Sequence, residues 1–162
     1  MAVEYSQVTQ DVLDIAQELI DKYHHHLLGA NIGFVFREPA AKSGGKVVLG
    51  KASKITNKYR PYLKQELDFM IELAGVEWCE LDSRRQVALV DHELCHLGMD
   101  DDGNLTIRAH DVEEFTEIVM RHGLWYQSLE QMADAVKNPQ LLLFSHNKRN
   151  GSLVAVDGWK HE

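Results

Sequence analysis

The stretch that decides the fold is Val90-Asp91-His92-Glu93-Leu94-Cys95-His96-Leu97, which contains a His-Glu-x-x-His motif. On a helix, residues four apart lie one above the other on nearly the same face. The imidazoles of His92 and His96 would therefore bind one Zn²⁺ together. Glu93 lies on an adjacent face, where it takes a proton from the activated water rather than binding the metal. The competing interpretation is a helix with two ordinary histidines.

Local signals around the motif predict that it is helical. Ser83 and Gln86 have the Ser-x-x-Gln spacing of a capping box, which predicts a helix that runs to about Leu97. Gly98 is then expected to be the C-terminal cap. Cys95 is interpreted as a small, buried packing residue rather than as a nucleophile or a ligand.

A catalytic zinc site needs a third protein ligand and one open position. Residues 99–104 predict a turn, and the short strand expected after it brings the chain back towards the motif. His110 follows this strand and is the preferred third ligand. Glu113, Glu114 and Asp111 remain alternatives, although Asp111 and Glu114 also have the spacing of a helix cap, and Glu113 also suits a carboxylate that orients a ligand histidine.

The rest of the chain predicts a mixed α+β fold, in which a small sheet packs against an N-terminal helix and the motif helix. Apolar residues recur at helical spacing over residues 8–27, and they alternate as in strands over 31–37 and 67–73. Residues 38–45 are expected to form a loop, and 47–49 a short strand. Two further helices are predicted, one opening at Asp111 and ending at Gly123, the other opening at Ser128 and ending before Pro139.

The bulk properties favour one domain without a disulfide framework. The chain has 162 residues, two cysteines and a formal net charge of -8. We expect a single domain over 1–162, with a core at about 8–137 and a C-terminal extension at 138–162. The acidic balance argues against a nucleic-acid partner, and the basic stretch 51–54 is interpreted as a solvated loop. No signal peptide or membrane span is predicted, which favours the cytoplasm.

The residues 88–96 and 108–115, in this order, resemble the putative phage metallopeptidase family, which is related to the SprT-like (Spartan) zinc peptidases. The resemblance covers roughly residues 10–127. It implies a compact zincin-like domain of the minimal gluzincin or SprT-like kind, with His92, His96 and His110 as zinc ligands and Glu93 as general base. The sequence departs from the SprT-like His-Gly-x-Glu-Phe pattern, because Asp111 replaces the glycine and one extra residue precedes Phe115.

The expected function is zinc-dependent hydrolysis of peptide bonds in a protein or peptide substrate. An extended substrate is expected to pair with a strand edge, either at 68–73 or at 32–37. If the protein is encoded by a phage, it would act in the host cytoplasm. The alternative is a catalytically silent zinc-binding protein that acts by binding a host protein, and such a protein would not need Glu93.

Overall fold

The computed structural model describes residues 2–138 and 151–156, and the chain groups into two units. The first unit comprises Met1–Arg108 and Ser145–Glu162, and the second comprises Ala109–Phe144. Both helices and strands are present, so the protein is of the mixed α+β class. The single domain expected over 1–162 stays a prediction, and each unit is described by itself below.

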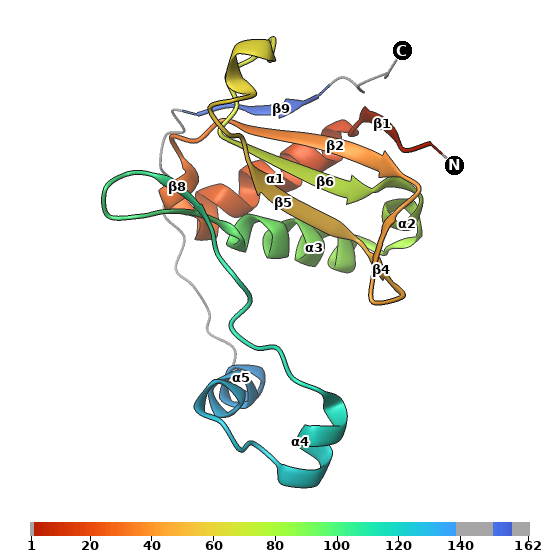
Figure 1. Cartoon of the computed structure of the whole chain (residues 1–162), viewed down its shortest axis with the longest axis vertical. Coiled ribbons are helices and arrows are strands. Elements are labelled where there is room, and N and C mark those ends of the chain that lie inside the picture. Colours follow the sequence, from red (N-terminus) through yellow and green to blue (C-terminus); the bar gives the residue numbers. More distant parts are fainter. Residues whose placement is uncertain (1, 139–150, 157–162) are drawn as a thin grey trace. The chain divides into compact units, whose positions relative to one another are not determined.

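The first unit is built on a five-stranded sheet with the order β1-β2-β6-β5, in which β9 also pairs with β2 (Figure 1). Strands β2 and β6 are parallel, whereas β1 and β5 are antiparallel to their neighbours. β9 runs parallel to the first half of β2, so the predicted C-terminal extension contributes a strand to the main sheet. The bounds are β1 (Glu4–Gln7), β2 (Ile32–Glu38), β5 (Gly50–Lys54), β6 (Phe69–Ala74) and β9 (Leu153–Ala155).

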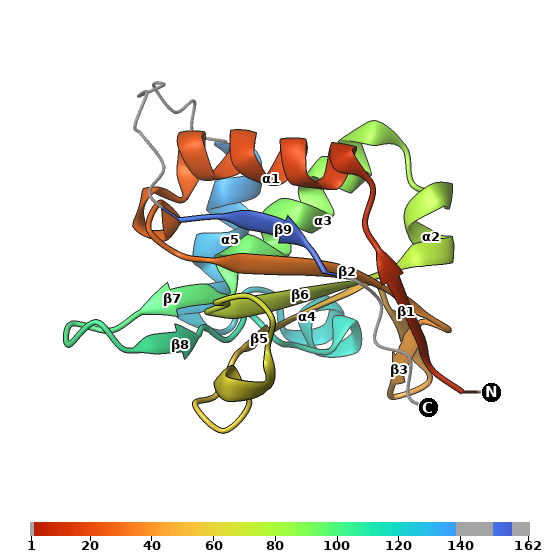
Figure 2. The same cartoon turned by 90° about the horizontal axis from the view of Figure 1, so that it is seen from above.

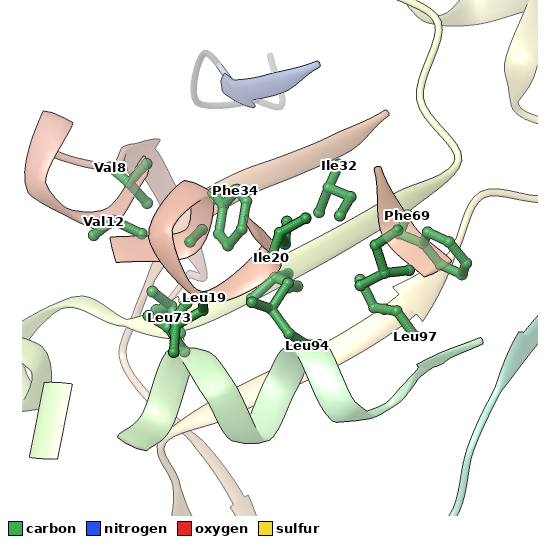
Figure 3. Packing of buried hydrophobic residues seen from close by; sticks show 14 of the residues in the cluster. Val8, Val12, Leu19, Ile20, Ile32, Phe34, Phe69, Leu73, Leu94 and Leu97 are labelled. Carbon is green, nitrogen blue, oxygen red and sulfur yellow. The ribbon is translucent and has the colours of Figure 1, made fainter. Parts of the chain in front are cut away.

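Two helices, α1 (Gln10–Tyr23) and α3 (Ser83–Cys95), cover one face of this sheet (Figure 2). The alternation predicted for 31–37 and 67–73 is confirmed, because the apolar side chains of β2 and β6 point to the helices and form the core. Figure 3 shows Phe34 of β2, Ile20 of α1 and Leu94 of α3 in this cluster. All three are fully buried, so the core fixes how α3 is rotated on the sheet.

The interpretation of residues 51–54 as a solvated loop is wrong. They belong to β5, which pairs with β6 through contacts such as Ala52 with Ile71. Ala52 packs against the core, while Lys51 and Ser53 alternate to the other face. Short strands with lysines are typical of sheet edges, where charge discourages pairing with other chains. The charge pattern of this edge strand therefore resembles that of a solvated loop.

Sheet order also corrects the expected strand edges. The strands at 32–37 and 68–73 are β2 and β6, and each has neighbours on both sides. Neither offers an open edge, whereas β5 is the last strand of the described sheet. The loop expected at 38–45 is partly a hairpin of β3 (Ala41–Ser43) and β4 (Lys46–Val48). Gly44 and Gly45 form its turn at φ 55° and 78°, which glycine adopts readily.

Helix α3 is confirmed, but both of its predicted caps are wrong. Asp82, one residue before Ser83, is the N-cap, and its carboxylate accepts from the Arg85 N–H at 2.9 Å. At the other end the helix stops at Cys95, and Gly98 lies in β7 (Leu97–Met99) instead of capping it. β7 pairs with β8 (Leu105–Ile107), which confirms the predicted turn and short strand. Short elements complete this unit: η1 (His25–Leu27), η2 (Arg60–Tyr62) and α2 (Gly75–Glu80).

The second unit contains α4 (Thr116–His122) and α5 (Gln127–Lys137). The capping box proposed for Asp111 and Glu114 is wrong, because α4 begins later, with Phe115 as N-cap. Gly123 does end α4, at φ 69°, and α5 ends before Pro139, as predicted. No helix in the described part of the chain is both long enough and apolar enough to cross a membrane.

Candidate metal centre on helix α3

The rotation of α3 assigns a separate role to each face of the motif. Val90 and Leu94 are fully buried in the core, one turn apart. Glu93 is buried as well, at 3% exposed, whereas His92 is exposed and His96 is half-buried. Because successive helical residues are rotated by about 100°, the packing of Val90 and Leu94 leaves the two histidines on the accessible side of the helix.

His92 and His96 lie together on that side. Their ring centroids are 5.0 Å apart, and the ring planes meet at 79°. His96 Nδ1 is 2.6 Å from the carbonyl oxygen of Arg108. A carbonyl oxygen only accepts, so Nδ1 carries a proton and donates it in this contact. Metal-binding histidines typically have their second nitrogen held in this way.

The β7–β8 hairpin returns the chain to His96. Its turn is held by Asp100, whose Oδ1 accepts from the N–H groups of Asp102 and Asn104. At the end of the hairpin, the Arg108 N–H donates to the His96 carbonyl oxygen at 2.7 Å. Arg108 is thus tied to His96 through both its N–H and its carbonyl group.

The candidates for a third ligand follow Arg108 directly. His110, the preferred candidate, stands two residues after Arg108 in the chain. Within the second unit, His110 Nδ1 is 3.7 Å from a carboxylate oxygen of Glu113. The carboxylate of Glu114 is already engaged, since it accepts from its neighbour's N–H and from Trp125 Nε1 at 3.0 Å. Of the alternatives to His110, Glu114 is therefore the least suited to metal binding.

Glu93 points into the protein, against β5. One carboxylate oxygen lies so close to Gly50 that an added Cβ there would stand 2.4 Å from it. The backbone N–H of Ala52 also hydrogen-bonds this carboxylate. The second oxygen, Oε2, is buried and has no hydrogen-bond partner among the described residues. A buried carboxylate oxygen without a partner is costly, which indicates that a further group belongs beside it.

Burial raises the pKa of Glu93 from 4.5 to about 7. Desolvation is the largest cause, because removal from water disfavours the charged form. The nearby His96 and the Ala52 N–H act in the opposite direction, since both favour the carboxylate. Such a carboxyl group exchanges a proton near neutral pH, which is the property of a general acid or base.

Sequence reasoning missed the part of this site that lies on β5. Gly50 is isolated between apolar and basic residues, and such a glycine in a strand often marks a close approach of another group. This glycine is the signal in the sequence, but the lysines after it favour a loop. The expectation that Cys95 is buried is wrong, because its side chain is exposed. It lies on the side of α3 away from the core residues Val90 and Leu94.

Two histidines lie one helical turn apart with a buried and incompletely satisfied carboxyl group between them, an arrangement that metal-dependent hydrolases use. A comparison with protein families supports this class, since the model described as "Putative phage metallopeptidase" matches residues 3–137. The chain belongs to this family. No curated protein and no solved structure gave a match.

Membership of a metallopeptidase family implies a metal ion, and the histidine group on α3 has the donors to bind one. The imidazole of His96, oriented through Nδ1, and the unpartnered Oε2 of Glu93 fit such an ion with a water beside it. The choice of zinc, the ligand roles of His92, His96 and His110, and the role of Glu93 stay predictions.

Proposed function

We propose that the protein is a zinc-dependent peptidase that hydrolyses peptide bonds with Glu93 as its general base. The observation that supports it most is the state of Glu93. This carboxyl group is buried beside His96, has one unpartnered oxygen and has a pKa near neutrality. A side chain with only a structural role in the core would have both oxygens satisfied.

His92, His96 and His110 are the proposed ligands. Arg108 is tied to His96, and two extended residues span at most about 7 Å, so His110 is within reach of the motif by chain length alone. Imidazole donors suit zinc better than calcium or magnesium, which prefer oxygen ligands. When bound, zinc would supply a Lewis acid that lowers the pKa of water and polarises a carbonyl group. Glu113, with a carboxylate oxygen 3.7 Å from His110 Nδ1, would orient the ring after closing to hydrogen-bond distance.

Glu93 would handle the proton in both halves of the reaction. It accepts a proton from the attacking water and later donates it to the leaving amine. Contact with Gly50 and the hydrogen bond from Ala52 hold the carboxyl group in place for both steps. Its pKa of about 7 suits a group that must gain and lose a proton in one cycle.

The substrate is proposed to be an extended segment of a protein or peptide. β5 is the last strand of the described sheet and lies next to Glu93, so an extended chain that pairs with it would bring a peptide bond to the motif. The proposed layout is zincin-like, and the position of α3 across one face of the sheet supports it. The net charge of -8 repels the phosphate backbone of nucleic acids, so a nucleic-acid partner is disfavoured.

The test compares Glu93→Gln with a matched control, Glu80→Gln, which changes an exposed carboxylate. We expect about one zinc per chain at this site in the parent and in both variants, and loss of that zinc in His92→Ala. Cleavage of a mixed peptide library, read by mass spectrometry, should be lost in Glu93→Gln and kept in Glu80→Gln. If Glu93→Gln cleaves the same peptides as fast as the parent, the proposed mechanism is refuted.

One observation favours the alternative, a silent zinc-binding protein that occupies a host protein. The second unit exposes several large apolar side chains, and such surfaces often contact partners. They include Phe115 (74%), Met120 (81%), Trp125 (57%) and Val136 (76%). This alternative predicts that zinc-loaded protein cleaves no member of the library, and that Glu93→Gln leaves the biological effect unchanged.

A further inference from the structure

Three consecutive histidines, His24, His25 and His26, follow α1, and the proposed peptidase makes no use of them. The three rings have two kinds of environment. His25 and His26 contact main-chain carbonyl oxygens through Nε2, at 2.8 and 2.9 Å. His24 is different, because its Nε2 lies 2.6 Å from a carboxylate oxygen of Asp91.

Asp91 belongs to the motif helix and lies one turn before Cys95. On α3, Asp91 and Cys95 are four residues apart, as His92 and His96 are. Asp91 directly precedes His92 in the sequence, and Cys95 directly precedes His96. The Asp91–Cys95 pair therefore lies on the neighbouring face of the helix, rotated by about 100°. His24, at the end of α1, meets this face.

The three side chains form a group of their own. His24, Asp91 and Cys95 each offer one ligand atom, and these atoms lie within 4.8 Å of one another. His24 is 5% exposed, Asp91 is half-buried and Cys95 is exposed. One ligand is thus held rigidly by the core, while the other two are accessible to an ion from solvent.

We propose that His24, Asp91 and Cys95 form a second metal site, which binds Zn²⁺ or a similar thiophilic divalent cation through Nε2, a carboxylate oxygen and the thiolate. A donor set of nitrogen, oxygen and sulfur suits zinc, and the sulfur and the imidazole disfavour calcium and magnesium. The cation replaces the proton between Nε2 and the carboxylate, and the thiol also loses its proton. A fourth position stays open to water.

The geometry needs only a small adjustment. Ligand atoms about 2.0–2.3 Å from one tetrahedral ion lie roughly 3.3–3.7 Å from each other. The nitrogen of His24 and the oxygen of Asp91, at 2.6 Å, must separate slightly, and the Cys95 sulfur, within 4.8 Å of both, must come to the same spacing. Asp91 and Cys95 have accessible side chains, so rotation about their own bonds can supply both movements.

A cation at this position would connect the end of α1 to the motif helix. The buried contact between His24 and Asp91 already joins these helices, and metal–ligand bonds would strengthen the connection. This site lies beside the one proposed for His92 and His96 but shares none of its ligands. It therefore supports the fold rather than the reaction, and its existence does not depend on peptidase activity.

The test is a titration of the reduced, metal-free protein with Co²⁺, because a cobalt–thiolate bond gives a near-ultraviolet charge-transfer band that histidine ligands do not give. We expect the band in the parent protein and its loss in Cys95→Ser, with the bound metal falling by one equivalent. Cys79→Ser is the matched control, since Cys79 is also exposed but lies outside the group, and it should keep the band.

Two further variants separate this proposal from the proposed function. His92→Ala should lose peptidase activity and one equivalent of zinc while it keeps the charge-transfer band. His24→Asn should weaken the band and raise the cobalt concentration at half-saturation at least tenfold. A parent protein without the band, or a Cys95→Ser variant that keeps it, overturns the second site and leaves His24 and Asp91 as a hydrogen-bonded pair only. A parent protein with the band but without peptidase activity refutes the proposed function alone.

Discussion

Replacing Glu93 by glutamine should make the metal-free protein more stable at alkaline pH. Glutamine has the shape of glutamate, and its carbonyl oxygen can accept the hydrogen bond from the Ala52 N–H. It has no charge to bury. Below the pKa of the unfolded chain, both proteins have a neutral side chain here and should be equally stable.

The size of the effect follows from the pKa of Glu93, which rises from 4.5 in the unfolded reference to about 7 in the folded protein. Between these values the folded protein keeps a proton that the unfolded chain releases. The free energy of unfolding of the parent therefore falls as the pH rises through this window and levels off above it. At about 1.4 kcal/mol per pH unit, the parent should lose roughly 3 kcal/mol that Glu93→Gln keeps.

Urea unfolding of both proteins in EDTA, at intervals from pH 4.5 to 8.5, measures this difference. The two free energies should coincide near pH 4.5 and diverge up to about pH 7, with Glu93→Gln the more stable. Glu80→Gln should follow the parent throughout, because the exposed Glu80 has no burial cost to lose. Equal stability of the parent and Glu93→Gln at pH 8 would refute the claim that burial governs this carboxyl group.

Three further perturbations test the surroundings of the site. Gly50→Ala places a Cβ 2.4 Å from the Glu93 carboxylate and should lower the free energy of unfolding in urea by about 1–3 kcal/mol. This loss should shrink in a Glu93→Ala background, because the clash is then removed. Gly29→Ala is the control, since a Cβ at Gly29 would meet no atom within 4 Å. Leu94→Ala removes a fully buried side chain and should cost about 2–5 kcal/mol, so a loss below 1 kcal/mol in thermal unfolding would contradict the core position. Zinc at about 1,000 times its Kd should stabilise the parent protein by roughly 4 kcal/mol, measured by calorimetry, and should stabilise His92→Ala by less. If zinc leaves the melting temperature of the parent protein unchanged, this result counts against any metal site.

Much of the first unit was predictable, because its signals are local. The period of α1 and the alternation of β2 and β6 each report one buried face, and the structure confirms all three elements. The return of the chain from His96 was also predictable, since residues 99–104 read as a turn. Asp100 and Gly103, at φ 80°, show why: the carboxylate accepts two backbone N–H groups and the glycine takes the left-handed conformation.

The errors arose where a local pattern has two meanings. Asp82 and Ser83 are both good N-caps, and only the hydrogen bond from the Arg85 N–H decides for Asp82. Gly98 would suit a helix end, but its missing side chain serves another purpose, because a Cβ there would lie 2.8 Å from the hydroxyl of Thr106 in the facing strand. β5 was mistaken for a loop because its pairing with β6 depends on contacts distant in sequence.

The sequence predicts which residues form the candidate site, but it does not predict how deeply each of them is buried. His92, Glu93 and His96 were chosen from spacing, yet spacing does not reveal which of them is buried. That depends on Val90 and Leu94, since their packing in the core fixes the rotation of α3. The same rotation turns the Asp91–Cys95 pair to the face that His24 meets.

The contact between Glu93 and Gly50 couples the chemistry of α3 to the edge of the sheet. A glycine at this point in β5 weakens the strand, because it has no side chain to pack and loses more backbone entropy on folding. Glycine is needed here because a Cβ at residue 50 would overlap the Glu93 carboxylate. Without that Cβ, the carboxylate reaches β5 and accepts a hydrogen bond from the Ala52 N–H. The strand proposed to pair with substrate therefore also holds the proposed base. A substrate that pairs with β5 would thus place its peptide bond in a fixed relation to Glu93, without help from a mobile loop.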